Sequence, residues 1–349
     1  MARHDLDTAY ITRPVSIAYL TGVHADPIER LMALVLRPDR ATLVVPAIER
    51  ENAERAGVEA DLVAWRDGED PYAEVARVMS GAHKVAVEKA HLTLAAAEAL
   101  GEKADHVPAF DIGPQILAMR RLKSAAEVGS LAEAGRITDA VTEVVLTRLR
   151  AGQSELEVGL ALGAAIGAAG ASLAFPSLVQ SGPNSALPHA LPSGRRLARG
   201  DLVLLDFGAA SGGYLADTTR MAVVGEPDPR QVEIHALVLA AHNAAIAAVR
   251  PGVTTGAVDA AAREVITRGG HGADFFHRTG HGLGLEAHEA PSLDPGSTTV
   301  LEEGMVFTIE PGVYLPGWGG VRIEDDVVVE AGGARLLTAA DRSLFVVDR

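Results

Sequence analysis

Four carboxylates and one imidazole stand within or beside apolar segments in the second half of the chain. They are Asp206, Asp217, His281, Glu310 and Glu324. A carboxylate at the end of a strand is usually solvated, so a single member of this set would mean little. Burying a carboxylate costs free energy unless the group is paired or binds a metal. Together the five side chains predict a site for two divalent cations, because one cation would not normally need four acids.

The donor atoms also indicate which metals would suit the site. A site dominated by carboxylates suits Mn, and the single histidine also admits Co, Zn or Fe. The 349 residues contain no cysteine, which excludes disulfides, a thiolate nucleophile and thiolate-ligated zinc or iron–sulfur clusters. We therefore expect an oxygen-rich divalent metal site, and we identify no residues that bind another cofactor.

Glycine-rich sequence surrounds the histidine of this set. Gly280, Gly282 and Gly284 flank His281, but they lack the strand–turn–helix setting and the register of a dinucleotide-binding loop. His277 lies four residues before His281, as on one face of a helix, yet three glycines in five residues disfavour a helix here. The pattern instead predicts backbone that packs closely around a metal ligand.

The elements expected to carry these donors are strands separated by glycine-rich turns. Apolar runs predict strands over residues 201–207, 219–225, 305–310 and 321–329. Helices are expected to begin at three capping patterns, which are Ser124 with Glu127, Ser154 with Glu157, and Asp228 with Gln231. Strands and helices are mixed rather than strictly alternating, which predicts an α+β domain with an antiparallel sheet.

The first third of the chain has a different organisation. Strands expected over residues 41–47 and 83–89 alternate with helical segments, which predicts α/β layering. Two prolines and a basic cluster, Arg120, Arg121 and Lys123, then mark a junction. A chain of this length favours two domains, and we expect them to span residues 1–120 and 121–349.

Charge and hydropathy exclude other classes of protein. The formal net charge of −15 argues against general binding of nucleic acid as the function, because phosphate binding needs clustered Lys and Arg. Residues 158–188 carry no charge, but glycines and prolines interrupt them, so we expect a buried helix and a strand rather than a membrane span. The first residues show no signal-peptide pattern, and a cytoplasmic location is expected.

Five segments of the second half, in order and with matching spacing, resemble a known family. They are GPNSALPHA, GDLVLLDFGAASGGYLADTTR, FHRTGHGLGLEAHE, FTIEPGVY and GVRIEDDVVV, and they resemble the M24 metallopeptidases with their pita-bread fold. The resemblance is to the proline-specific branch, Xaa-Pro dipeptidase (prolidase) and Xaa-Pro aminopeptidase. The segment YLTGVHADPIERLMALVL resembles the creatinase-like N-terminal domain of that branch.

The resemblance implies a role for each donor. Asp206 matches a ligand of one metal, Asp217 and Glu324 match the two bridging acids, and His281 and Glu310 match ligands of the other metal. His189, His277 and His288 match histidines that line the substrate pocket. Independently of the resemblance, Arg322 lies two residues before Glu324, so both side chains are expected on the same face of the strand. There Arg322 could hold Glu324 or the substrate, and structural support and direct catalysis are equal alternatives.

The ligand set predicts a hydrolytic mechanism. Two metals lower the pKa of a bridging water and so supply hydroxide near neutral pH. His288 is expected to stabilise the oxyanion, and Glu310 to pass the water proton to the leaving proline nitrogen.

The resemblance favours a dipeptidase that works as a homodimer. The segment HADPIER, with Asp26, Glu29 and Arg30, resembles a loop that in prolidases crosses a dimer interface and narrows the partner's active site. A charged turn without a substrate role is an equal alternative. Two other functions stay open: an Xaa-Pro aminopeptidase acting on longer peptides, and a pita-bread protein of another class, either a non-peptidase hydrolase or lyase or a binding module.

Overall fold

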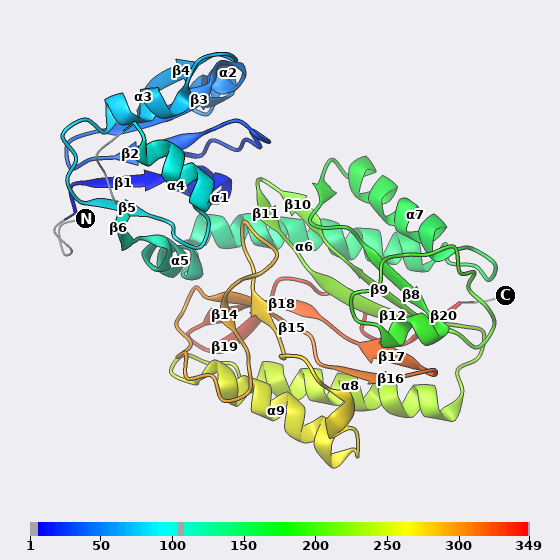
Figure 1. The fold of residues 1–349 in the computed structure, drawn as a ribbon. Helices are drawn as coiled ribbons and strands as arrows, with labels where there is room; N and C mark the ends of the chain where they lie inside the picture. Colours follow the sequence, from blue (N-terminus) through cyan, green and yellow to red (C-terminus); the bar gives the residue numbers. More distant parts are fainter. Residues whose placement is uncertain (1–5, 104–107, 348–349) are drawn as a thin grey trace. The chain divides into compact units, whose positions relative to one another are not determined.

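A computed structural model describes residues 6–103 and 108–347. The chain divides into two compact units, Met1–Arg120 and Arg121–Arg349 (Figure 1). Each unit contains its own buried apolar clusters. Within these described residues, no helix is long and apolar enough to cross a membrane.

The first unit is built on a six-stranded sheet with the order β4-β3-β2-β1-β5-β6. Its strands are β1 (Thr8–Ile11), β2 (Ala33–Leu36), β3 (Ala41–Pro46), β4 (Asp61–Trp65), β5 (Val85–Val87) and β6 (Pro108–Asp111). Strand β2 is antiparallel to both β1 and β3, whereas β3–β4, β1–β5 and β5–β6 are parallel pairs. The strands expected near residues 41–47 and 83–89 are confirmed as β3 and β5.

Helices cover both faces of this sheet. They are α1 (Pro14–Thr21), α2 (Arg50–Arg55), α3 (Pro71–Val78), α4 (Leu94–Gly101) and α5 (Gly113–Arg121). Ile11 of β1 shares a cluster with Ile17 of α1, while the preceding Tyr10 belongs to a second cluster with Val75 of α3 and Leu100 of α4. Successive strand side chains thus enter opposite cores, and the expected α/β layering is confirmed.

The second unit contains two larger sheets with two small ones beside them. A four-stranded sheet has the order β20-β12-β9-β8 and a five-stranded sheet the order β14-β13-β15-β18-β19, with β11-β10-β7 and β16-β17 as smaller sheets. The strands are β7 (Ser172–Leu173), β8 (Leu178–Ser181), β9 (Leu202–Phe207), β10 (Ala209–Ser211), β11 (Tyr214–Leu215), β12 (Thr218–Val224), β13 (His281–Gly282), β14 (Glu289–Ser292), β15 (Val306–Ile309), β16 (Gly312–Leu315), β17 (Gly319–Arg322), β18 (Asp325–Glu330), β19 (Gly333–Leu336) and β20 (Phe345–Val347). Nearly all of these pairs are antiparallel, as expected; β12–β20 is parallel.

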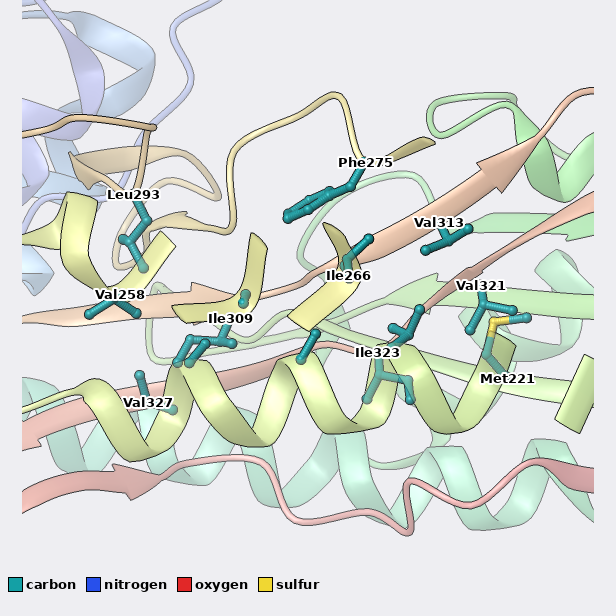
Figure 2. Packing of buried hydrophobic residues seen from close by; sticks show 14 of the residues in the cluster. Met221, Val258, Ile266, Phe275, Leu293, Ile309, Val313, Val321, Ile323 and Val327 are labelled. Carbon is teal, nitrogen blue, oxygen red and sulfur yellow. The ribbon is translucent and has the colours of Figure 1, made fainter. Parts of the chain in front are cut away.

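Two helix pairs enclose these sheets (Figure 1). The helices are α6 (Ala125–Leu146), α7 (Glu155–Ala168), α8 (Pro229–Ala248) and α9 (Thr255–Arg268). Helices α6 and α7 pack on one face of β9 through a cluster that includes Val203 and Phe207. The alternate residues Leu202 and Leu204 belong to the core that α8 and α9 close, part of which appears in Figure 2. The three expected capping boxes are present at α6, α7 and α8.

Two expectations from the sequence need correction. Residues 321–329 do not form one strand: β17 pairs with β16, whereas β18 pairs with β15 and β19. The chain changes sheets at Glu324, because its backbone N–H donates to Thr219 instead of continuing either ladder. Helix α7 is also not buried all round, since Leu156 and Leu160 are exposed on its outer face.

Candidate metal centre and active site

Strand pairing within the second unit brings the predicted donors together. Thr219 of β12 pairs with Asp206 of β9 on one side and forms an isolated bridge with Glu324 on the other. On the five-stranded sheet, the His281 backbone donates to Thr308 Oγ1 at 3.1 Å. These pairings explain how donors more than 100 residues apart in sequence reach one place.

A cavity of about 1110 Å³ is lined by all nine candidate residues of the second half of the chain. They are His189, Asp206, Asp217, His277, His281, His288, Glu310, Arg322 and Glu324. Phe175, Leu178, Leu187, Leu191 and Phe276 add apolar walls. The cavity therefore has a charged floor and an apolar surround, as in many small-molecule sites.

The donor atoms have the spacing that a metal centre needs. Ligand atoms of Asp217, His281 and Glu324 lie within 4.8 Å of one another, and His281 Nε2 lies 3.4 Å from Glu310 Oε1. The Oδ1 atoms of Asp206 and Asp217 are buried and accept no hydrogen bond. Buried carboxylate oxygens without donors fit a site built to bind cations.

The electrostatics of the cavity support the same conclusion. Burial, followed by the neighbouring Glu324 and Asp206, raises the pKa of Asp217 well above its usual range. Burial also raises the pKa of Glu310 to about 7. Burial lowers the pKa of His281 to about 3, with a further contribution from His288. A neutral imidazole beside crowded carboxylates is suited to binding a metal, whereas the carboxylates repel one another without one.

Backbone packing around His281 is as close as the glycine pattern predicted. A Cβ atom on Gly280 would lie 1.9 Å from Thr308 O, and one on Gly282 would lie 2.2 Å from Ala290 O. Any larger residue would have to displace the backbone that carries the imidazole. His281 lies in β13 and not in a helix, so that expectation is confirmed.

Arg322 is the buried cation of the cavity. Its Nη2 donates to Asp206 Oδ2, its Nη1 donates to the Tyr314 hydroxyl at 3.0 Å, and its Nε donates to Thr219 Oγ1 at 3.0 Å. The Glu324 carboxylate lies further away, at 4.0 Å. Arg322 therefore contacts Asp206 more closely than it contacts Glu324, which is the acid that the sequence pattern had suggested.

Tyr314 joins Arg322 to His277, and sequence analysis did not select it. The tyrosine hydroxyl lies 2.9 Å from His277 Nε2, and His277 Nδ1 lies 2.7 Å from the Arg278 carbonyl. Because Arg322 only donates and a carbonyl only accepts, the hydroxyl proton points to Nε2 and the imidazole proton is on Nδ1. Both ring nitrogens of His277 therefore take part in hydrogen bonds. Tyr314 lies in the same FTIEPGVY segment as Glu310, which is the signal that could have identified it.

The other two histidines are more accessible. The ring of His288 lies 4.1 Å from the ring of His281, centroid to centroid, and burial together with Arg278 lowers the pKa of His288. His189 is exposed and lies between β8 and β9 in a segment that lines the cavity. Both imidazoles therefore line the cavity and remain accessible from it.

The loop candidates Asp26, Glu29 and Arg30 belong to the first unit. Arg30 donates to Asp67 through Nε at 3.0 Å and Nη2 at 2.9 Å, and to Glu29 through Nη1 at 3.0 Å. Asp26 Oδ1 accepts from the N–H of Ile28, which has a φ of 59°. The loop is thus an exposed charged turn whose arginine is paired within its own unit.

Comparison with known proteins identifies the family. Residues 129–331 match metallopeptidase family M24, and residues 1–122 match the creatinase/prolidase N-terminal domain. The chain belongs to metallopeptidase family M24. The expected creatinase-like domain and pita-bread catalytic domain are confirmed.

Individual relatives are similar over nearly the full length. The chain is 36% identical to an Xaa-Pro dipeptidase of Lactobacillus delbrueckii subsp. lactis, over 99% of this chain and 96% of that protein. It is similar to the solved structure of an Xaa-Pro dipeptidase from Bacillus anthracis, with 36% identity and a TM-score of 0.93 over 99% and 96% of the two chains. The structure of an X-Pro aminopeptidase from Thermotoga maritima is also similar, with 31% identity and a TM-score of 0.88 over 98% of each chain.

Neutralising a bridging candidate should remove the effect of metal on stability. We expect Mn²⁺ to raise the melting temperature of the metal-free protein, because a ligand at 100-fold its Kd stabilises the folded state by about 2.7 kcal/mol. In Glu324→Gln this rise should be absent, while the metal-free variant should melt no lower than wild type, because one repelling charge is gone. The measurement is calorimetric melting with and without Mn²⁺. Glu330→Gln, at the exposed end of β18, is the control, and a full Mn²⁺ response in Glu324→Gln would contradict the site.

Glu310 should make the metal-free protein less stable as the pH rises. Its pKa is about 7 in the folded chain against an ordinary value of 4.5, so the folded state binds more protons between these values and loses stability as pH increases. The free energy of unfolding of metal-free Glu310→Gln, measured relative to that of wild type, should therefore increase by on the order of 3 kcal/mol between pH 4.5 and 7.5. Urea unfolding of both proteins in chelator measures this difference. The exposed Glu303→Gln serves as control, and parallel pH profiles for Glu310→Gln and wild type would show that burial does not raise this pKa.

Proposed function

We propose that the chain is a dinuclear metal-dependent hydrolase of the Xaa-Pro peptide bond, acting as an Xaa-Pro dipeptidase (prolidase). The observation that carries this proposal is the cavity in which four carboxylates and a neutral histidine converge beneath two accessible imidazoles. Membership of family M24 supports metallopeptidase chemistry, and relatives that are Xaa-Pro dipeptidases support the substrate class. The two domains are proposed to meet at residues 120 and 121.

Five residues are proposed to hold two divalent cations per subunit. The ligands would be Asp206, Asp217, His281, Glu310 and Glu324, with Asp217 and Glu324 shared between the cations. The donor set of four carboxylates and one imidazole fits Mn, and Co, Zn or Fe are the alternatives that the histidine admits. The unpartnered Oδ1 atoms of the two aspartates supply the free donor atoms that such a site requires.

The chain's own groups would then perform the proton transfers. When bound, two divalent cations would supply hydroxide near neutral pH and polarise the scissile carbonyl. Glu310, which lines the cavity beside His281, would take a proton from the attacking water and deliver it to the departing proline nitrogen. His288 would donate a hydrogen bond to the carbonyl oxygen as negative charge develops there. His189 would contact the peptide at the mouth of the cavity, while His277 and Tyr314 would hold Arg322 in place.

Dipeptide specificity and a homodimer form the finer part of the proposal. Asp26, Glu29 and Arg30 of a partner subunit would narrow the cavity and contact the ends of a dipeptide. Arg30 would have to exchange its pairing with Asp67 for the substrate carboxylate. The second candidate is an Xaa-Pro aminopeptidase, favoured by the similarity to the Thermotoga maritima structure. A cytoplasmic location stays a prediction.

A comparison of peptide lengths tests this proposal. We expect wild type loaded with Mn²⁺ to cleave Ala-Pro with a kcat/KM at least about 10-fold higher than that for a tripeptide with the same Ala-Pro bond, because the tripeptide places an amide where the carboxylate should bind; each 1.4 kcal/mol of lost contact is tenfold. Arg30→Ala should reduce this preference, whereas Arg66→Ala, an arginine close in sequence to Asp67, should not.

Equal cleavage of both peptides by wild type would contradict the dipeptidase and favour the aminopeptidase. A strong preference that survives in Arg30→Ala would keep the dipeptidase but remove the loop from its explanation. Hydrolysis of neither peptide would contradict both functions and favour the non-peptidase alternatives.

A further inference from the structure

A single segment between β8 and β9 forms much of the cavity wall. Residues 187–191, which include His189, all line the cavity. The segment leaves β8 at Ser181, passes through a short 3-10 helix over Gly182–Ala186, and returns to the start of α7, where Ser193 O accepts from the Leu156 N–H. Regular strand or helix pairing does not hold residues 187–191, so other contacts must fix their position.

The side chain of Glu155 joins the two ends of this segment. Oε1 accepts from the Ser181 N–H at 2.8 Å, from Ser181 Oγ at 2.7 Å and from Asn184 Nδ2 at 3.0 Å. Oε2 accepts from the Ser193 N–H at 3.0 Å and from Ser193 Oγ at 2.6 Å. Asn184 Nδ2 also lies 3.2 Å from Oε2. Oε1 thus binds the start of the segment, and Oε2 binds its end together with Asn184.

Helix α7 does not need this carboxylate for its own stability. Ser154 and Glu157 already form the capping box at its N-terminus. Glu155 is nevertheless fully buried, although an exposed side chain would serve equally well at the first position of a helix. Its carboxylate therefore acts on the segment and not on the helix.

Hydrogen-bond donors around Glu155, with Arg195 nearby, compensate the charge of its carboxylate. Burial acts to raise its pKa, but hydrogen bonds from Ser193 and Ser181 outweigh burial and lower the pKa overall. Arg195 donates to Ser181 Oγ at 2.6 Å and pairs with Asp201. An ionised carboxylate can accept all of these donors at once, whereas a neutral amide would turn its NH₂ group toward at least one of them.

We propose that Glu155 is a positioning residue of the active site, which clamps both ends of segment 181–193 and so holds His189 and the wall 187–191 over the metal centre. The consequence for catalysis rests on the proposed function, whereas the clamp itself does not. Glu155 should affect substrate turnover through His189, without affecting the binding of metal.

The experiment compares Glu155→Gln with Glu157→Gln, which lies on the same helix and keeps a capping side chain. Hydrogen–deuterium exchange of peptides covering residues 181–193 should rise in Glu155→Gln and stay at the wild-type level in Glu157→Gln. Mn²⁺ binding by calorimetry should be unchanged in both variants. With Ala-Pro, kcat/KM of Glu155→Gln should fall by about 10- to 100-fold, the range expected when a group moves by up to about 1 Å.

A double-mutant cycle separates positioning from general destabilisation. If Glu155 acts through His189, Glu155→Gln should lower kcat/KM by less than about threefold in a His189→Ala background. If Glu155→Gln fails to fold, Ser193→Ala replaces it in every measurement, because this variant removes the hydroxyl donor to Glu155 at one end of the segment and keeps the backbone donor.

Three results would overturn the proposal: unchanged exchange in Glu155→Gln, a collapse of Mn²⁺ binding, or losses that simply add in the double variant. If wild type cleaves no Xaa-Pro peptide, the proposed function fails. In that case the comparison of hydrogen–deuterium exchange between Glu155→Gln and Glu157→Gln still tests whether Glu155 holds segment 181–193 in place.

Discussion

Repulsion among buried carboxylates is the interaction on which the second unit depends. Asp206, Asp217, Glu310 and Glu324 face one cavity. Within the part of the chain that the structure describes, Arg322 is the one buried cation of this cavity that is bonded to any of them. Asp325, the next acid along the chain, is also buried but lies among basic side chains. Burial acts to raise the pKa of Asp325, but His242 and Arg220 beside it lower the pKa on balance. The fold therefore surrounds Asp325 with basic side chains, whereas the proposed divalent cations would balance the acids of the cavity.

The architecture holds this unfavourable cluster in place through backbone pairing. Thr219 is paired with Asp206 on one side and Glu324 on the other, so the spacing of two acids is set by main-chain hydrogen bonds. Packing of α6 and α7 on one side and of α8 and α9 on the other buries the sheets that carry the donors. Apolar burial of this extent can offset several kcal/mol of electrostatic cost. The proposed metal site would then be held in place before a cation binds.

The sequence predicted those features that depend on residue type and local spacing. The capping boxes at Ser124, Ser154 and Asp228 begin helices because they involve residues only three apart. The converging donors were recognisable because acids are rare in apolar strands, and the family motifs strengthened that inference. The roles of the individual donors stay predictions.

Features that depend on partners distant in sequence could not be predicted in this way. The change of sheets at Glu324 follows from pairing with Thr219, 105 residues away, whereas the local pattern is that of one continuous strand. Glu155 belongs to an ordinary helix sequence, and its partner Ser193 is known only once the chain is folded. Tyr314 lies in a recognisable segment, but its partner His277 is likewise known only from the folded chain. The pairing of Arg30 with Asp67 likewise joins residues from different elements.

The most direct test of the central claim is the number of divalent cations bound per chain when hydrolysis reaches its maximum. Mn²⁺ would be titrated into the metal-free protein, with calorimetry and Ala-Pro hydrolysis recorded on the same sample. The account predicts no hydrolysis without metal and a maximum at two ions per chain. Full hydrolysis in the presence of chelator, or saturation with Mn²⁺ without any cleavage of Ala-Pro, would contradict it.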